Sequence, residues 1–89
     1  AAPEPTFVLP RHRIVDAAVV GHGHVRARLR SRDGQAIGAI AFRSAQGPLG
    51  QAILSSVGRE VHVAGTLSVD TWRGAERAQM RICDLAYFD

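Results

Sequence analysis

Three arginines recur at every second position, as Arg26, Arg28 and Arg30, and His24 continues the same spacing toward the N-terminus. Side chains two residues apart share one face of a β-strand, so this spacing predicts a strand face lined with guanidinium groups. A guanidinium stays protonated, presents a planar fork that matches a phosphate, and stacks on flat rings. The pattern therefore fits a surface that binds a polyanion, and it equally fits a charged face that only contacts water.

A tryptophan and an arginine are adjacent at Trp72 and Arg73, in a turn-like segment that ends at Gly74. An aromatic ring that stacks on a base of a single-stranded nucleic acid contributes about 1–3 kcal/mol per base. Trp72 could instead pack over its own hairpin, in which case the ring would be structural.

All eleven Lys and Arg residues are arginines, and eight Asp and Glu residues leave a formal net charge of +3. An all-arginine surface favours anionic partners. A coding bias would also explain it, because the chain contains no Asn and is rich in Ala and Gly. The positions of the arginines, more than their number, therefore carry the functional argument.

Other chemistry finds little support in the sequence. His22 and His24 are the only closely spaced histidines near a strand end, Cys83 is the single cysteine, and no zinc-binding or metalloprotease spacing is present. The serines lie in no nucleophile motif and the carboxylates are scattered. We expect neither catalytic residues nor a metal or other cofactor in this chain.

The apolar pattern has a period of two over most of the chain, which predicts β-strands. Residues 1–10 hold three of the four prolines and read as an extended lead-in, and residues 11–89 read as one folded domain. The predicted strands span residues 13–20, 24–30, 35–42, 60–69 and 75–85, and a short helix spans residues 48–57 between the third and fourth strands. Pro48 and Gly58 mark the two ends of that helix.

A tight turn at residues 31–34 would pair Arg30 with Gln35 in an antiparallel hairpin. In that register Leu29 faces Ala36 on the inner side, and Arg28 faces Ile37 on the outer side. Ile37 would then supply an apolar contact beside the arginines. Leu67, Val69 and Ala78 are expected to face inward.

Three strands, a short helix and two more strands is the element order of the OB-fold, a five-stranded Greek-key β-barrel in an all-β class. An SH3-like barrel is the main alternative, but it usually lacks a helix at this point. Gly38 and Gly65 lie in the middle of strands, where a small barrel needs strong coiling or close backbone approach. The OB-fold binds ligands on strands two and three and in two of its loops. These regions carry the candidate binding residues, which are His24, Arg26, Arg28, Arg30, Ile37, Trp72 and Arg73.

The chain resembles the OB domain of RecJ-type exonucleases, which are specific for single-stranded DNA. Residues 2–7 (Ala-Pro-Glu-Pro-Thr-Phe) resemble the Asn-Pro-Glu-Pro-x-Phe run at the start of that domain, with Ala2 in place of Asn. Further matches, in order, are Val-Gly followed by His-Val-Arg-Ala-Arg-Leu within residues 20–29, Ile-Gly-Ala-Ile-Ala-Phe at 37–42, Val-His-Val-Ala-Gly-Thr-Leu at 61–67, Trp-Arg-Gly at 72–74 and Gln-Met-Arg-Ile at 79–82. Arg26 and Arg28 stand where the family often has lysine, which preserves the charge.

The resemblance implies an accessory domain that binds single-stranded DNA for a 5′-to-3′ exonuclease in DNA repair and recombination. In that family a separate domain with an Asp-His-His motif holds divalent manganese or magnesium, and this chain has no such motif. The implied partners are single-stranded DNA, the catalytic domains of the same polypeptide and a single-strand-binding protein. A module that binds an acidic peptide of a partner protein is the alternative.

The location of the protein is expected to be cytoplasmic, without a membrane segment. Cys83 is unpaired and no leader sequence is evident, which fits a reducing compartment. The longest uncharged stretch, residues 44–58, is shorter than the roughly 20 apolar residues that a spanning helix needs.

Overall fold

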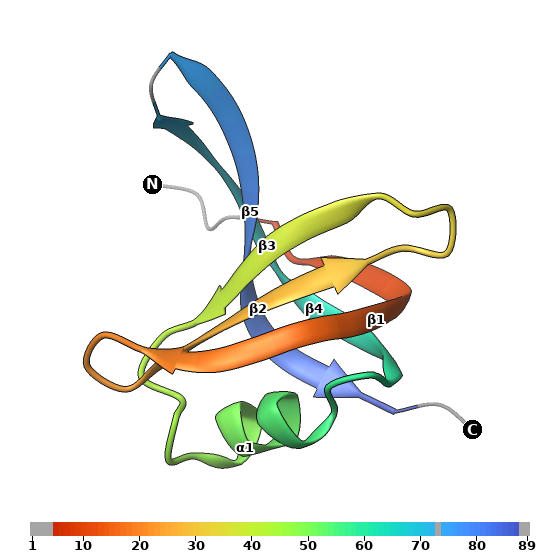
Figure 1. Ribbon diagram of the computed structural model, residues 1–89, viewed down its shortest axis with the longest axis vertical. Coiled ribbons are helices and arrows are strands. Elements are labelled where there is room, and N and C mark those ends of the chain that lie inside the picture. The colour runs from red at the N-terminus through yellow and green to blue at the C-terminus, as the bar shows by residue number, and fades with distance from the viewer. Residues whose placement is uncertain (1–4, 73, 88–89) are drawn as a thin grey trace.

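The computed structural model describes residues 5–72 and 74–87, and these form a closed five-stranded barrel with one short helix. The order of strands around the barrel is β1-β2-β3-β5-β4, and only the β3–β5 pair is parallel. This confirms the predicted all-β OB-fold. The elements, in chain order, are β1 (Phe7–Val20), β2 (His24–Arg30), β3 (Ala36–Ala41), α1 (Pro48–Ser55), β4 (Glu60–Trp72) and β5 (Ala75–Ala86) (Figure 1).

The first strand begins earlier than the proline-rich lead-in predicts. Phe7 to Leu9 pair with β4, and the pairing is interrupted between Leu9 and His12. Pro10 lies in this interruption, where a strand residue needs no backbone donor, and Arg11 has a positive φ of 53°. The long β1 strand therefore bends at Pro10 and Arg11, so that its first part pairs with β4 and its second part with β2.

The barrel interior is filled by the inward residues of all five strands and by the helix. The largest fully buried side chains are Ile14, Leu29, Ile53, Met80, Val25, Val61 and Val63. Ile53 comes from α1, which covers one end of the barrel (Figure 1). The helix starts at Pro48 as predicted but ends at Ser55, and the hydroxyl of the buried Ser56 lies 3.0 Å from the Tyr87 hydroxyl. None of the described helical segments has the length and apolarity needed to cross a membrane.

The β2–β3 hairpin pairs one residue out of the predicted register. Leu29 lies opposite Ile37, because Gln35 belongs to the turn and not to the strand. The Ser31 N–H donates to the Gln35 carbonyl at 2.8 Å, and the Ser31 hydroxyl accepts the Gln35 N–H at 3.1 Å. Since a one-residue shift turns every side chain over, Ile37 packs against the core and does not lie on the outer face beside the arginines.

The same turn perturbs one carboxyl group. The Ser31 hydroxyl also donates to the Asp33 carboxylate, and this hydrogen bond lowers the pKa of Asp33, with a smaller contribution in the same direction from the backbone of Gln35. The turn is therefore held by the serine side chain as well as by backbone hydrogen bonds.

The β4–β5 hairpin extends beyond the barrel (Figure 1). Leu67 and Val69 were expected to face inward, but they are 40% and 65% exposed, and Ala78 opposite Val69 is exposed as well. The period-two pattern gave the correct face for these residues, but the barrel does not reach far enough along the hairpin to cover it.

The mid-strand glycines Gly65 and Gly38 differ in the space that a side chain would find at each position. At Gly65 a Cβ atom would overlap the backbone carbonyl of Arg81 on β5, so the expected close approach of two strands is present there. At Gly38 a Cβ atom would meet nothing within 4 Å. Gly38 therefore leaves open space on the outer surface and is not required by packing.

We predict that Gly65→Ala lowers the free energy of unfolding by about 3 kcal/mol, because overpacking against a neighbouring strand forces the backbone to move. Gly38→Ala is the matched control, and it should change the free energy of unfolding by no more than about 0.5 kcal/mol. Urea unfolding followed by circular dichroism measures both values. Equal stability of the two variants would contradict the packing seen at Gly65.

Candidate nucleic-acid interface

The outer face of β2 carries the predicted row of arginines. Arg26, Arg28 and Arg30 are exposed, whereas Val25, Ala27 and Leu29 between them are buried. Within residues 5–72 and 74–87, the structure shows no ion pair or hydrogen bond from these three guanidinium groups. Their charges are therefore directed at solvent and not used to hold the barrel together.

The floor beside this row consists of small residues of β3. Ala36, Gly38 and Ile40 lie opposite Arg30, Arg28 and Arg26, and their side chains share the outer face. Ala36 and Gly38 are exposed, and Gly38 has no side chain to fill the space above it. The surface over β3 is consequently low compared with the β2 row.

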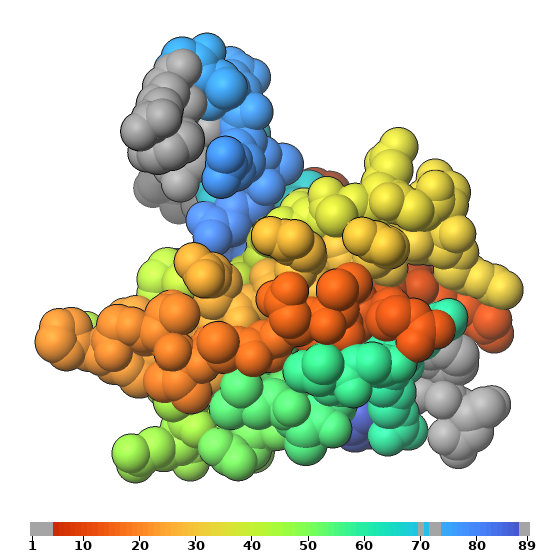
Figure 2. Space-filling view, in the orientation of Figure 1, coloured from red at the N-terminus to blue at the C-terminus, as the bar shows by residue number. Residues whose placement is uncertain are grey.

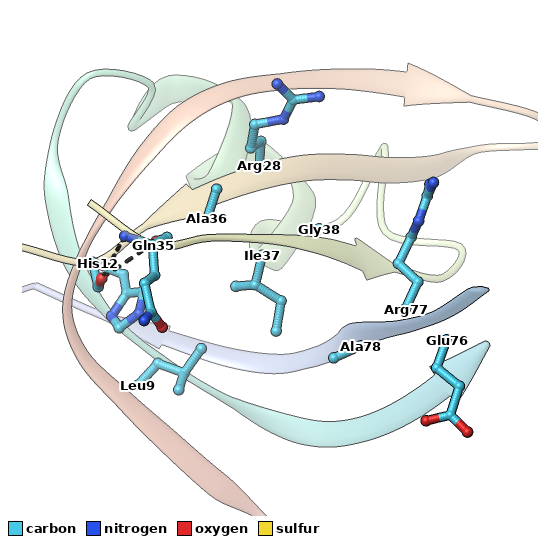
Figure 3. Close-up of a pocket in the computed structure, with 11 residues that line it drawn as sticks. Leu9, His12, Arg28, Gln35, Ala36, Ile37, Gly38, Glu76, Arg77 and Ala78 are labelled. Carbon is cyan, nitrogen blue, oxygen red and sulfur yellow. Dashed lines mark hydrogen bonds between the residues drawn. The ribbon is translucent and has the colours of Figure 1, made fainter. Parts of the chain in front are cut away.

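A second row of arginines borders β3 on the other side. The parallel pairing places Gln79 beside Gly38 and Arg81 beside Ile40, and Arg77 lies one step further along β5. Figure 3 shows that Arg28 and Arg77 come from the two strands that flank the strand carrying Gly38. The result is a groove of about 440 Å³ between β2 and β5, which we term the arginine groove, lined by Asp16, Arg26, Ala27, Arg28, Gly38, Ala39, Arg77, Ala78 and Gln79.

An exposed aromatic ring, Phe42, lies past the end of β3 next to these arginines. The Arg81 guanidinium lies 4.8 Å from the centre of the Phe42 ring, and the His24 ring contacts Phe42 edge-on with centroids 5.2 Å apart. His24 is also fixed, because its Nδ1 accepts the Arg43 N–H at 2.8 Å. Phe42 remains 45% exposed, so its ring can still offer a flat apolar surface to a ligand.

Arg30 also belongs to a basic corner at the β2–β3 turn. A concavity of about 280 Å³ at this corner is lined by Arg11, Arg13, Arg30, Ser31, Arg32, Gly34 and Glu60. Arg13 is engaged within the protein, since its guanidinium donates to the Gly58 carbonyl and lies 3.5 Å from the Glu60 carboxylate. The corner extends the positive charge of the arginine groove toward β1.

The structure gives the positions of most of the predicted site residues and leaves others undescribed. It brings His24, Arg26, Arg28 and Arg30 onto one face, whereas Ile37 points to the end of the barrel. Trp72 closes the hairpin by pairing with Ala75, but its side chain and the whole of Arg73 lie outside the described residues.

Sequence reasoning missed Phe42, Arg77 and Arg81 as members of the site. Arg77 and Arg81 alternate with inward residues such as Met80, and the strand order of an OB barrel, which places β5 beside β3, brings them to the groove. In the incorrect register Phe42 would share the inner face with Ala36, because the two are an even number of residues apart on one strand. The correct register continues the outward row Ala36, Gly38, Ile40 to Phe42.

The positions of the groups that could bind a metal ion are also relevant to the site. Among residues 5–72 and 74–87, the structure shows no group of three or more His, Cys, Asp or Glu side chains that could hold a metal ion. Cys83 is exposed and unpaired.

Comparison with solved structures relates the barrel to a small single-stranded DNA-binding protein from Streptomyces coelicolor. The two share 16% sequence identity with a TM-score of 0.65, and the alignment covers 99% of this chain and 96% of the other. At this identity the likeness establishes the fold. Comparison with curated proteins finds no match.

Comparison with family models gives the more specific result. The model of the RecJ OB domain matches residues 1–84, which is nearly the whole chain and includes all of β1 to β4 and most of β5. This protein therefore belongs to the RecJ OB domain family.

Proposed function

We propose that this chain is the accessory domain that binds single-stranded DNA for a RecJ-like 5′-to-3′ exonuclease acting in DNA repair and recombination. Family membership and the likeness of the barrel to a single-stranded DNA-binding protein support this proposal. The observation that carries it is the arginine groove, in which two rows of guanidinium groups border a floor of small residues.

The geometry of the groove fits a single strand. Neighbouring strands lie about 4.8 Å apart, so the rows on β2 and β5, with β3 between them, are separated by roughly 10 Å. One flexible sugar-phosphate backbone over β3 can therefore reach both rows. Five arginines would contact phosphates, namely Arg26, Arg28, Arg30, Arg77 and Arg81, and Phe42 would stack on a base at one end.

In this proposal the chain binds and orients the strand, and hydrolysis takes place in a separate domain of the same polypeptide. That domain would carry the Asp-His-His motif and a manganese or magnesium ion. An Asp-His-His motif encoded in the same reading frame would support the exonuclease role, and a reading frame without one would contradict it.

The salt dependence of DNA binding tests the arginine groove. We assume that each of five arginines neutralises about one phosphate, namely Arg26, Arg28, Arg30, Arg77 and Arg81. The slope of log affinity against log salt is then about −3.5 for a single strand. Replacing Arg26, Arg28 and Arg30 by alanine should move this slope to about −1.5. Fluorescence anisotropy of a labelled oligonucleotide of about ten nucleotides, titrated at several salt concentrations, measures both slopes.

Two control variants isolate the cause of that change. Replacing the same three arginines by lysine keeps the charges and should keep the slope, and Arg59→Ala removes one charge beside Tyr87, outside the groove. Thermal unfolding of each variant shows whether the fold is retained. An unchanged slope in the alanine variant would identify β2 as a solvated face, and tighter binding of an acidic peptide than of DNA would favour the protein-interaction alternative.

Phe42→Leu tests the stacking contact separately. Leucine keeps an apolar side chain but removes the ring, so affinity for the oligonucleotide should fall about tenfold, within the range of one stacked base. The salt slope should not change, because no charge is removed. Phe7→Leu is the matched control, since Phe7 is similarly exposed at 43% but lies on β1 where it pairs with Gly65 of β4. Equal affinities of the two variants would exclude Phe42 from the interface.

The isolated chain should not degrade DNA. We expect a labelled single strand incubated with the purified chain and manganese to stay intact, because the described residues offer no cluster of metal ligands. Gel electrophoresis of the strand measures this. Cleavage that disappears when one Asp or His of this chain is replaced would refute the assignment of catalysis to another domain.

A further inference from the structure

The barrel opens where β3 and β5 diverge. Residues 38–40 of β3 pair with residues 79–81 of β5, and the described structure shows no further pairing between these two strands. On its N-terminal side β5 extends back to Ala75 as part of the projecting β4–β5 hairpin. Figure 2 shows this hairpin standing clear of the rest of the molecule. Between the diverging strands lies a cleft of about 680 Å³, which we term the hairpin cleft, lined by Leu9, His12, Arg28, Ser31, Gln35, Ala36, Ile37, Gly38, Glu76, Arg77 and Ala78.

Apolar side chains form one part of the lining of the hairpin cleft, beside polar and charged ones such as Gln35 and Glu76. Leu9 and Ile37 are half-buried at the open end of the barrel, and Figure 3 shows them and Ala78 around a common space. Val69, the neighbour of Ala78 across the hairpin, is 65% exposed. Apolar side chains gathered in a concavity of this size are typical of a binding site, since small-molecule pockets span about 300–1,000 Å³.

The cleft is continuous with the arginine groove. Arg28 and Arg77 line both concavities, and so do Gly38 and Ala78, which lie at the boundary between them. A backbone held by these two arginines would therefore place an attached group directly at the apolar opening. The facing edges of Ala36–Ile37 and Glu76–Ala78 also form no pairing with each other among the described residues, so backbone donors and acceptors face the cleft.

We propose that the hairpin cleft receives one unstacked nucleobase of the bound single strand, while Arg28 and Arg77 hold the adjoining phosphate. This inference rests on the proposed function and adds a base-binding subsite to it. A nucleobase has the required chemistry, because its faces are apolar and its edges carry hydrogen-bond donors and acceptors. The subsite would make affinity depend on the presence of bases and not only on phosphate charge.

The test uses a variant that fills the cleft without changing charge. Ala78→Ile adds a β-branched side chain at an exposed strand position, and Ala86→Ile makes the same change at an exposed position at the other end of β5. Each protein is titrated with a ten-nucleotide oligothymidylate and with a strand of the same length that lacks bases, across a salt series. The readout is the affinity for oligothymidylate divided by the affinity for the strand that lacks bases.

We expect Ala78→Ile to lower this ratio about tenfold relative to the wild type, the lower range for one stacked base. The salt slope should stay as in the wild type, and Ala86→Ile should leave both quantities unchanged. An unchanged ratio in Ala78→Ile would overturn the base-binding subsite. If the wild type still binds with the expected salt slope, the proposed function would then remain in place. A wild type that shows no salt-dependent binding would contradict both the base-binding subsite and the proposed function.

A second measurement needs no variant. In wild-type protein with labelled isoleucine methyl groups, the Ile37 δ1-methyl resonance should shift when oligothymidylate is added, because a ring would lie against it. The strand without bases should leave this resonance in place. An acidic peptide that shifts the Ile37 methyl while oligothymidylate does not would assign the cleft to a protein partner and overturn the proposal.

Discussion

The short parallel pairing of β3 with β5 is the contact on which the other features of this protein depend. It pairs residues 38–40 of β3 with residues 79–81 of β5 and thereby closes the barrel. The inward members of the paired segments, Ala39 and Met80, are fully buried in the core. The outward members bring the β5 arginines to the side of β3 opposite the β2 row, and the cleft begins where the pairing ends.

The arginines of β2 destabilise the isolated domain through repulsion between their charges. Residues two apart on a strand are about 7 Å apart, which is less than the Debye length of about 8 Å at physiological salt, so their charges repel one another. The described structure shows no ion pair to Arg26, Arg28 or Arg30, and the single carboxylate opposite them, Asp16 across from Arg28 on β1, offsets only part of this repulsion. A phosphate backbone laid along the row would remove it, which gives a physical reason for an anionic ligand at this face.

Much of the fold could be predicted from the sequence, because the dominant signals are local. The alternation of Val25, Ala27 and Leu29 with arginines fixes the two faces of β2, and Pro48 and Gly58 mark a helix at the point where an OB barrel has one. The predicted β2–β3 register was wrong by one residue, because Ser31 and Gln35 bond to each other within the turn through backbone and side-chain hydrogen bonds. This one-residue difference determines whether Ile37 or Phe42 lies on the outer face.

The rest of the site arises from long-range geometry. Arg77 and Arg81 reach the groove because β5 pairs with β3, a strand far away in the sequence. Val69 is exposed because the β4–β5 hairpin extends beyond the barrel. No local pattern distinguishes these positions from ordinary strand residues. The sequence therefore placed the arginines of β2 on an outward face, as the structure has them, but the second wall of the candidate site and its cleft required the three-dimensional structure.

Mapping of a bound oligonucleotide by backbone amide chemical shifts tests the central claim most directly. If the groove between the two arginine rows is the binding surface, the shifted amides should cluster in β2, β3 and the 77–81 segment of β5. The amides of α1, at the end of the barrel, should stay in place. Shifts confined to α1 and to residues 61–64 of β4, with none at Gly38 or Gln79, would contradict it.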